Sequence, residues 1–177
     1  EPDRDLAGAV EALHAAFGDR AQRHPRALVT VTTHDTKRTA DARARLDALA
    51  LHAERWARCV RAWRRRHAPL RARAESLRGV QAAPDANLAW LLYQAFACIW
   101  PAGVAEPDAE ARAALAERIA AYAEKAAREA KTHTSWVDQC GAWEAGVRAW
   151  VQALAVEPAG AAFRADLAAL LRRVEPD

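Results

Sequence analysis

The stretch Asn87 to Trp100, NLAWLLYQAFACIW, is apolar on nearly every side of a helix and is followed directly by Pro101. A helix that is hydrophobic all round belongs in the middle of a protein, where other elements cover each of its sides. Proline disfavours the helical conformation in the residue before it, so we expect this helix to end near Trp100. The stretch therefore predicts a fold built around one central, buried helix.

The segments that flank the central helix carry apolar residues on one face. In residues 54–67, Trp56, Val60 and Trp63 recur three or four positions apart, which is the spacing of a single helix face. A helix through Leu46 and Leu49 is expected to begin after Thr36 or Thr39, either of which can cap it. The same spacing predicts further helices in 5–23, 108–131, 143–154 and 167–174. The sequence thus predicts a mainly α protein, an array of about six or seven helices.

Residues 27–33, ALVTVTT, are the one stretch that predicts a strand. They end in five consecutive β-branched residues and show no helical period, and they are apolar enough for a buried parallel strand. A lone buried strand would leave its backbone hydrogen-bonding groups without partners. We therefore expect the pairing strands to lie outside this chain. The absence of Met and the start at Glu1 also led us to expect a fragment of a larger protein.

Length and composition favour one folded domain. The chain has 177 residues, of which 52% are hydrophobic, and it contains 7 Trp against 7 Gly and 8 Pro. Such a chain can bury a core and is unlike a disordered one. It has no apolar run long enough for a membrane span, so we expect no membrane partner. The 3 Cys show no CxxC spacing, which favours free thiols in a reducing, cytoplasmic compartment.

The basic residues are mostly arginine: 23 of the 26 Lys and Arg residues. Residues 54–78 contain nine Arg against two Glu, a pattern that can bind phosphate groups. Trp56 and Trp63 lie on the apolar stripe of that segment, however, and arginine is abundant throughout, so we expect no nucleic-acid partner. The 6 His never occur as HxxxH or HExxH, so we expect no metal and no other cofactor.

A first polar cluster follows the predicted strand: Thr33-His34-Asp35-Thr36-Lys37-Arg38. In a (β/α)8 barrel, active-site residues lie at the carboxyl ends of the strands. There the Asp35 carboxylate could stabilise a developing positive charge, and His34 could bond to substrate hydroxyl groups. On residue types alone, the simpler interpretation is favoured, in which Asp35 caps a helix and Lys37 and Arg38 are solvated.

A second polar cluster, Lys131-Thr132-His133-Thr134-Ser135-Trp136, follows the longest predicted helix. Lys131 and His133 near a helix C-terminus are ordinary partners of the helix dipole. The alternative is a contact to a sugar or an anion, with Trp136 as a stacking platform. On residue types alone, the helix-dipole interpretation is preferred.

The sequence resembles the malto-oligosyltrehalose synthases of the α-amylase superfamily. RALVTVTTHDTKRTADARARL (26–46) is similar to their segment with a strand, THDTKR and a helix. The similarity continues in order through 87–101, which ends in Trp-Pro, through 118–136, which contains AREAK and HTSW, and through 144–154. It spans essentially the whole chain. The chain departs from the family pattern at Ala40 and Ala42, and in the loop 137–140.

The resemblance implies a fold and a division of the chain. Residues 1–38 would supply a helix, a barrel-type strand and a catalytic loop, and residues 39–177 a helical insertion after the seventh strand of a (β/α)8 barrel. The strand at about 27–33 would then pair with the remainder of the barrel. The nucleophile and the acid/base of the parent enzyme would lie outside this chain, so we expect the chain alone to be inactive.

The resemblance also implies an activity. The family converts the reducing-end α-1,4 bond of malto-oligosaccharides into an α,α-1,1 trehalose bond by retaining intramolecular transglucosylation, which makes the parent an isomerase of trehalose biosynthesis. Asp35 matches the transition-state-stabilising carboxylate. His34, Lys37 and Arg38 match substrate-side positions. Lys131, His133 and Trp136 match a second motif of the family, whose role is substrate-side or structural. Two alternatives remain: another α-amylase superfamily glucanotransferase, or a non-catalytic helical interaction module with a basic face at 54–78.

Overall fold

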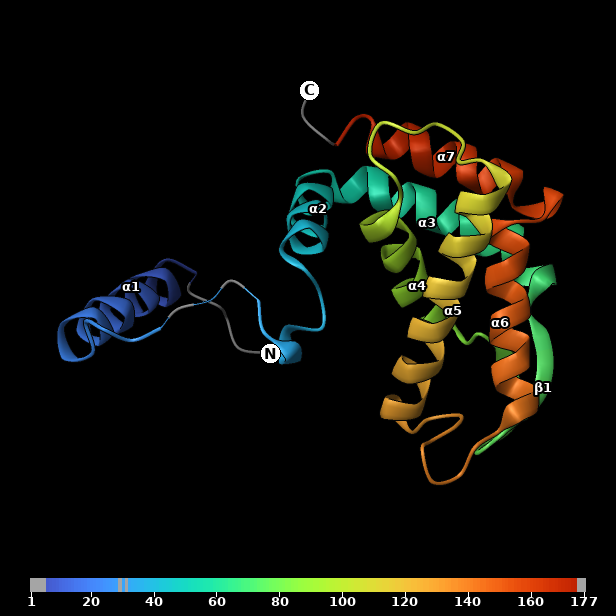
Figure 1. Cartoon of the computed structure of the whole chain (residues 1–177), viewed down its shortest axis with the longest axis horizontal. Coiled ribbons are helices and arrows are strands. Elements are labelled where there is room, and N and C mark those ends of the chain that lie inside the picture. Colours follow the sequence, from blue (N-terminus) through green and yellow to red (C-terminus); the bar gives the residue numbers. More distant parts are fainter. Residues whose placement is uncertain (1–5, 29, 31, 175–177) are drawn as a thin grey trace. The chain divides into compact units, whose positions relative to one another are not determined.

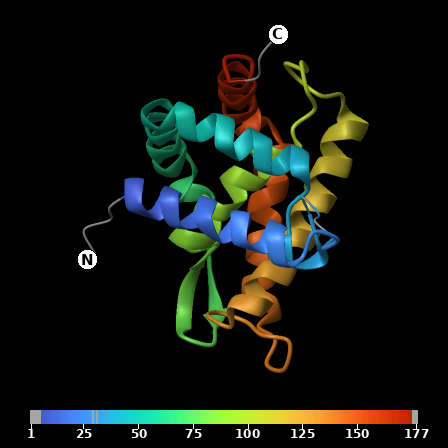
Figure 2. The same cartoon turned by 90° about the vertical axis from the view of Figure 1, so that its left-hand side faces the viewer.

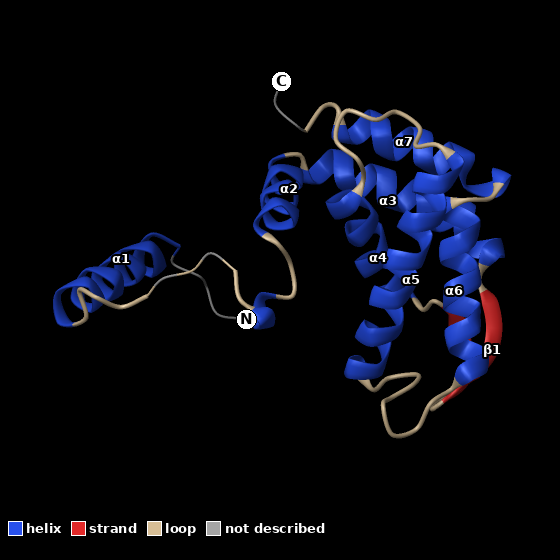
Figure 3. Cartoon of the chain, in the orientation of Figure 1, coloured by secondary structure: helices blue, strands red, loops and turns tan. Residues whose placement is uncertain are grey.

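The computed structural model describes residues 6–28, 30 and 32–174. The chain divides into two compact units, residues 1–37 and 38–177 (Figure 1). Most of the described residues are helical, and the strands among them form one short hairpin (Figure 3). The mainly α fold class predicted from the sequence is therefore confirmed.

The first unit contains helix α1 (Leu6–Arg23) and a short 3-10 turn, η1 (His34–Thr36). Helix α1 matches the amphipathic helix predicted for 5–23. The apolar side chains of its predicted stripe are exposed in this unit, at 54% for Val10, 51% for Leu13 and 59% for Phe17. The helix therefore forms as its amphipathic pattern predicts, but no described residue of the unit packs over its apolar face.

The strand predicted for 27–33 is not formed in the described residues of that stretch. Ala27, Leu28, Thr30, Thr32 and Thr33 have no regular secondary structure, whereas Val29 and Val31 lie outside the described residues. A strand is stabilised by hydrogen bonds to a neighbouring strand, and the described part of this unit offers none. The β-propensity of the run is therefore not enough to form a strand in this chain.

The described residues of the second unit, 38–174, form six α-helices, two 3-10 turns and the hairpin. The helices are α2 (Ala40–Leu51), α3 (Ala53–His67), α4 (Ala86–Ile99), α5 (Ala109–Ala130), α6 (Gly141–Ala155) and α7 (Ala161–Leu171). The turns are η2 (Ala68–Leu70) and η3 (Pro158–Gly160). Side-chain oxygens of Thr39, Asp85 and Asp108 cap α2, α4 and α5 by accepting a backbone N–H three residues further on. No described helix is both long and apolar enough to cross a membrane.

Helix α4 is the buried centre of the second unit, as its apolar sequence predicts. Helix α5 packs against both α4 and α6, and α3 packs against α7 (Figure 1). Aromatic rings join these layers: Phe163 of α7 contacts Trp63 of α3 and Phe96 of α4 edge-on, at centroid distances of 5.0 and 5.1 Å. The stripe of α3 is buried, with Trp56 8% and Trp63 0% exposed, so these tryptophans are core residues.

The hairpin of β1 (Ala72–Ser76) and β2 (Gly79–Ala83) was not predicted from the sequence. Its strands are antiparallel, and Gly79 has the positive φ of 74° that follows a tight turn. Both strands pack on α6 at Gly146, where an added Cβ would lie 2.8 Å from the Cβ of Ala83. Figure 2 shows the hairpin, in green, beside the loop that follows α5. The two are joined where Leu77 N–H donates to the carbonyl of His133 at 3.1 Å.

Candidate functional site

The first polar cluster folds as a compact local turn. Thr33 is extended and caps η1, because its hydroxyl accepts from the N–H of Asp35 at 3.2 Å. In return, the N–H of Thr33 donates to the hydroxyl of Thr36 at 3.2 Å. Lys37 ends the turn with φ 58° and ψ −4°, a left-handed conformation that is costly for residues other than glycine. The turn is therefore held by its own threonines.

His34, Asp35 and Lys37 gather at the surface of this turn. The Asp35 carboxylate lies 3.3 Å from His34 Nδ1 and 3.7 Å from Lys37 Nζ. The side chains are 82% exposed for His34, 89% for Asp35 and 45% for Lys37. Exposed ion pairs of this kind contribute little to stability. The turn thus brings three of the predicted site residues together and leaves Asp35 accessible to solvent.

Arg38 lies on the other side of the boundary, in the second unit. Its guanidinium donates to Cys98 Sγ in α4 at 3.3 Å. Burial raises the pKa of the Cys98 thiol, whereas the charge and hydrogen bond of Arg38 oppose that rise. One turn into α2, Arg45 donates to the carbonyl of Trp100 at 2.6 Å. Arg38 is thus the first of two arginines that join the start of the second unit to the C-terminal half of α4.

The second polar cluster leaves the C-terminus of α5 and runs into α6. Lys131 caps α5 with φ 54° and ψ 27°, and its N–H donates to the carbonyl of Ala127 at 3.2 Å. Its side chain is exposed, as expected for a partner of the helix C-terminus. Lys37 and Lys131 are the two non-glycine residues with positive φ among the described residues.

His133 is buried, at 7% exposed, and both of its ring nitrogens have partners. Nε2 lies 2.9 Å from an oxygen of Asp85, the residue that caps α4, and Nδ1 lies 3.3 Å from the hydroxyl of Ser76 in β1. The ring stacks on Trp143 of α6 with centroids 4.7 Å apart. His133 therefore joins the hairpin, α4 and α6, which is a structural role.

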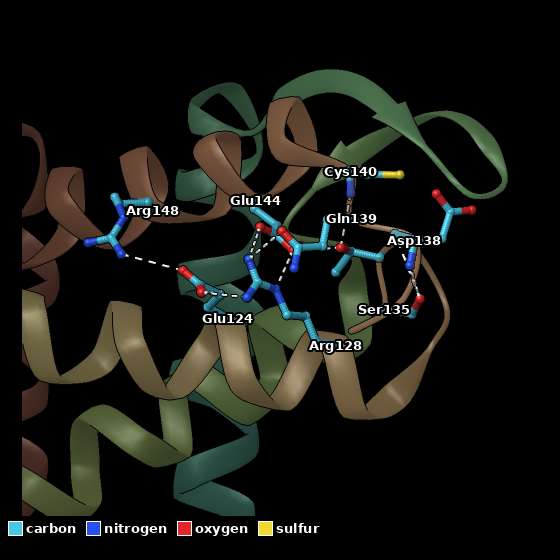
Figure 4. A network of polar contacts seen from close by, with 9 residues as sticks. Glu124, Arg128, Ser135, Asp138, Gln139, Cys140, Glu144 and Arg148 are labelled. Atoms are coloured by element: carbon cyan, nitrogen blue, oxygen red, sulfur yellow. Dashed lines mark hydrogen bonds and ion pairs between the residues drawn. The ribbon is translucent and has the colours of Figure 1, made fainter.

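Trp136 is the exposed tip of the same loop, with 52% of its surface exposed. The guanidinium of Arg128 in α5 lies over its ring, 5.2 Å from the centroid, in a cation–π contact. Arg128 is itself fixed by Glu144 of α6, to which it donates two hydrogen bonds of 2.7 and 2.8 Å, and by Glu124 at 3.0 Å (Figure 4). The indole ring is therefore presented to solvent on a rigid support.

Glu144 connects this support to the loop backbone. Its carboxylate also accepts from the hydroxyl of Thr134 at 2.5 Å, and the N–H of Cys140 donates to that hydroxyl at 3.1 Å. The hydrogen bonds from Arg128 hold the pKa of the Glu144 carboxyl below its ordinary value, against the opposing effect of burial. Glu144 thus stays ionised and keeps both ends of the loop 131–140 together.

A pocket of about 200 Å³ lies beside His133. Its walls are the last turns of α5, the first turn of α4 and Trp143, and most of them are apolar. Asp85, Asn87 and Thr132 supply polar groups together with His133. The second cluster therefore borders a small pocket, although the hydrogen-bonding groups of His133 are already engaged by the protein.

The sequence did not reveal Glu144 or Asp85 as partners in the second cluster. The pair Glu124–Arg128 follows from the i,i+4 spacing of a helix. The bond from Arg128 to Glu144 joins two helices, and the bond from His133 to Asp85 spans 48 residues, so both depend on the tertiary fold. Within the part of the chain that the structure describes, no group of three or more His, Cys, Asp or Glu could hold a metal ion.

Comparison with known proteins gives a consistent result. No family model matches the chain. Over all 177 residues it is 35% identical to proteins named maltooligosyl trehalose synthase from two strains of Mycobacterium tuberculosis. A solved structure of a mutant maltooligosyltrehalose synthase from Arthrobacter ramosus matches 93% of the chain, with a TM-score of 0.66 and 35% identity.

Both comparisons match the chain to part of a much longer protein, because it spans 20% of the Mycobacterium proteins and 18% of the Arthrobacter one. The chain is therefore related to one largely helical segment of a larger enzyme. The proteins that contain the matching segment are named maltooligosyl trehalose synthase, and the chain is similar to that segment along its whole length. The resemblance found from the motifs is thus confirmed.

Proposed function

We propose that this chain forms part of the active region of a malto-oligosyltrehalose synthase. The parent enzyme would move the reducing-end glucose of a malto-oligosaccharide from an α-1,4 to an α,α-1,1 bond. The observation that carries the proposal is the exposed Asp35, in a pre-formed turn of a chain that is 35% identical to such proteins along its whole length. The family's names indicate trehalose synthesis, and the details of the reaction are our proposal.

Asp35 would act by its charge. Glycosyl transfer with retained configuration passes through transition states with oxocarbenium character, and a fixed carboxylate near the sugar ring stabilises the positive charge that develops. Lys37 Nζ lies 3.7 Å from that carboxylate, so both groups would reach the same part of the substrate. His34 would bond to hydroxyl groups of the same sugar, and Lys37 and Arg38 would line the reducing-end side.

The second cluster would contribute a platform rather than a reacting group. Trp136 is half-exposed and supported by Arg128, and an aromatic face of this kind suits the apolar side of a glucose ring. Lys131 would bond to sugar hydroxyls, because its side chain is exposed. For His133 we propose contact with substrate only through the adjoining pocket, since both ring nitrogens bind protein groups.

The proposal includes the place of the chain in the parent enzyme. Residues 1–38 would complete a (β/α)8 barrel of the α-amylase type, and residues 39–177 would form a helical insertion. The nucleophile and the acid/base would be carboxyl groups outside residues 1–177. In this arrangement the run 27–33 would gain its strand partners from the remainder of the barrel, and the enzyme would act in the cytoplasm.

The test uses a full-length synthase that contains this segment. Asp35→Asn removes the charge and keeps the size, so trehalosyl formation from maltopentaose should fall about 1,000-fold or more. His34→Gln should raise KM with a smaller loss of kcat. Asp41→Asn, a change on the surface of α2, is the matched control and should leave turnover unchanged. Near-normal turnover of Asp35→Asn would contradict the proposal.

Product analysis separates the proposal from the second candidate within the superfamily. A synthase yields a non-reducing trehalosyl product of unchanged chain length, whereas another glucanotransferase yields reducing chains of new lengths. The isolated 177-residue chain should release neither product. Measurable activity of the isolated chain would show that the missing carboxyl groups are not required.

A further inference from the structure

A groove on the second unit, outside both polar clusters, is surrounded by arginine. It lies between α3 and α7 and has a volume of about 350 Å³. Arg55 and Arg58 of α3 and Arg173, just after α7, line it together with Cys59 and Asp166. Volumes of about 300 to 1,000 Å³ are usual for sites that take small molecules. The groove is thus large enough for a ligand of the size of a monosaccharide derivative.

The negative charge of the groove is already neutralised. Asp166 accepts from Arg66 at 2.8 Å and from the indole N–H of Trp63 at 3.2 Å. Asp166 and Arg173 are seven positions apart, which corresponds to roughly 10 Å along a helix. Asp166 therefore lies away from the end of the groove where Arg173 is found.

Within the described residues, the positive charge of the three arginines that line the groove is largely unmatched. Arg58 has a long contact of 3.8 Å with Glu54, whose side chain is 95% exposed. Among the described residues, no carboxylate oxygen lies within 4.0 Å of the guanidinium nitrogens of Arg55 or Arg173. Guanidinium groups bind phosphate oxygens in pairs and are favoured over lysine for this purpose. Three of them line this one groove, a composition that suits a phosphate group.

We propose that the groove between α3 and α7 binds a phosphate group, as inorganic phosphate or as part of a small phosphorylated metabolite, through Arg55, Arg58 and Arg173. A nucleic acid is less well suited to this surface. Stacking platforms for bases would be needed beside the phosphate sites, and Trp56 and Trp63 of α3 are buried in the core. The proposal does not depend on the function proposed for Asp35.

Cys59 provides a reporter inside the groove. Burial raises the pKa of its thiol and Asp166 adds to that rise, while Arg55 and Arg58 lower it. A bound phosphate would screen those two arginines and cover the sulfur, so alkylation of Cys59 by iodoacetamide should become slower. Cys140 is similarly half-buried but lies on the far loop, so it serves as an internal control.

The experiment titrates the chain with inorganic phosphate and, separately, with glucose 6-phosphate at constant ionic strength. We expect saturable one-to-one binding by calorimetry, together with protection of Cys59 and none of Cys140. Arg55→Gln and Arg173→Gln should each weaken binding about tenfold, since each removes a charge-assisted hydrogen bond. The matched controls are Arg65→Gln and Arg172→Gln, exposed arginines outside the groove, which should bind as the unchanged chain does.

Each outcome decides the proposal. Tighter binding of the sugar phosphate, lost in the same two groove variants, identifies a phosphorylated metabolite as the ligand, and equal binding identifies the phosphate group alone. Equal losses in all four variants would indicate a diffuse charge effect and would overturn the proposal. An oligonucleotide that binds more tightly than either ligand, with a steep salt dependence, would assign the surface to nucleic acid instead. Absence of binding and of Cys59 protection would also overturn it.

Discussion

The two polar clusters differ in what holds their side chains in place. His34, Asp35 and Lys37 are exposed and contact one another within a single turn. His133 and Thr134 are buried, and their partners come from β1, α4 and α6. Packing thus explains why His133 and Thr134 occupy their positions in the second cluster. It does not explain why His34, Asp35 and Lys37 occupy theirs in the first. An exposed, pre-formed group whose identity packing does not require is the stronger candidate for chemistry.

The two motif histidines test this difference most directly. His133→Ala removes the stack on Trp143 and leaves the Asp85 carboxylate without its partner, so the free energy of unfolding should fall by about 2 to 3 kcal/mol. His34→Ala should change it by less than about 0.5 kcal/mol. In urea unfolding, tryptophan fluorescence reports on the second unit, where all 7 Trp lie, and far-UV circular dichroism adds the helix of the first unit, which contains His34. Similar losses of stability in His133→Ala and His34→Ala would show that the two clusters do not differ in how they are held.

A pH titration tests the buried side of the comparison with a third histidine. His67 is fully buried, its Nδ1 lies 2.9 Å from the hydroxyl of Tyr93, and burial lowers its pKa to about 4. Between its ordinary pKa of 6.5 and about 4, the unfolded chain binds a proton that the folded chain does not. Stability is therefore fully present above pH 6.5 and falls as the pH is lowered through this window.

Between pH 6.5 and about 4, the free energy of unfolding should fall by about 2 kcal/mol as a result of His67. This is less than the full pKa shift of His67 implies, because solvent screens the arginine charges near the ring. His67→Gln keeps a hydrogen-bonding group near Tyr93 but does not titrate, so its stability should depend less on pH in this window. Chemical unfolding at pH 7, 6, 5 and 4 gives both curves. Parallel curves for the two proteins would show that other groups cause the loss.

The helices could be predicted from the sequence because their apolar spacing is a local property. The hairpin could not, because ARAES and GVQAA contain one β-branched residue, Val80, between them. The two strands form where α6 offers the small Gly146. The run 27–33 shows the opposite case. It has strong β-propensity, and its described residues form no strand, since propensity supplies no partner.

In the candidate site, too, local features could be predicted from the sequence and tertiary contacts could not. The turn of Thr33 to Lys37 is held by residues within four positions of one another, so its sequence indicates a local polar cluster. The support of Trp136 is different, because Arg128 and Glu144 are 16 residues apart and meet only when α5 packs on α6. Motif spacing identified the exposed groups, whereas the structure was needed to find what fixes them.

The two left-handed lysines give a smaller and more local test. Lys131 caps α5 in a conformation that glycine adopts without strain, so Lys131→Gly should raise the free energy of unfolding by about 1 kcal/mol. Lys37→Gly should leave the unfolding of the second unit unchanged, since Lys37 belongs to the first unit. Thermal unfolding followed by tryptophan fluorescence measures both. Destabilisation by Lys131→Gly would mean that its side chain makes a contact needed for the fold.

Trp136→Ala should have the smallest effect on stability, below about 0.5 kcal/mol, because the side chain is 52% exposed and Arg128 keeps both of its carboxylate partners. Val137→Ala, at a neighbouring residue that is 98% exposed, is the control. Acrylamide quenching should show a smaller accessible fraction of tryptophan in Trp136→Ala and no change in Val137→Ala. A large loss of stability would make Trp136 part of the scaffold and contradict its role as a platform. An unchanged stability would show that the second cluster has two kinds of residue. His133 and Thr134 would fix the loop by packing. Trp136, like Asp35, would have no role in packing and would remain available to a ligand.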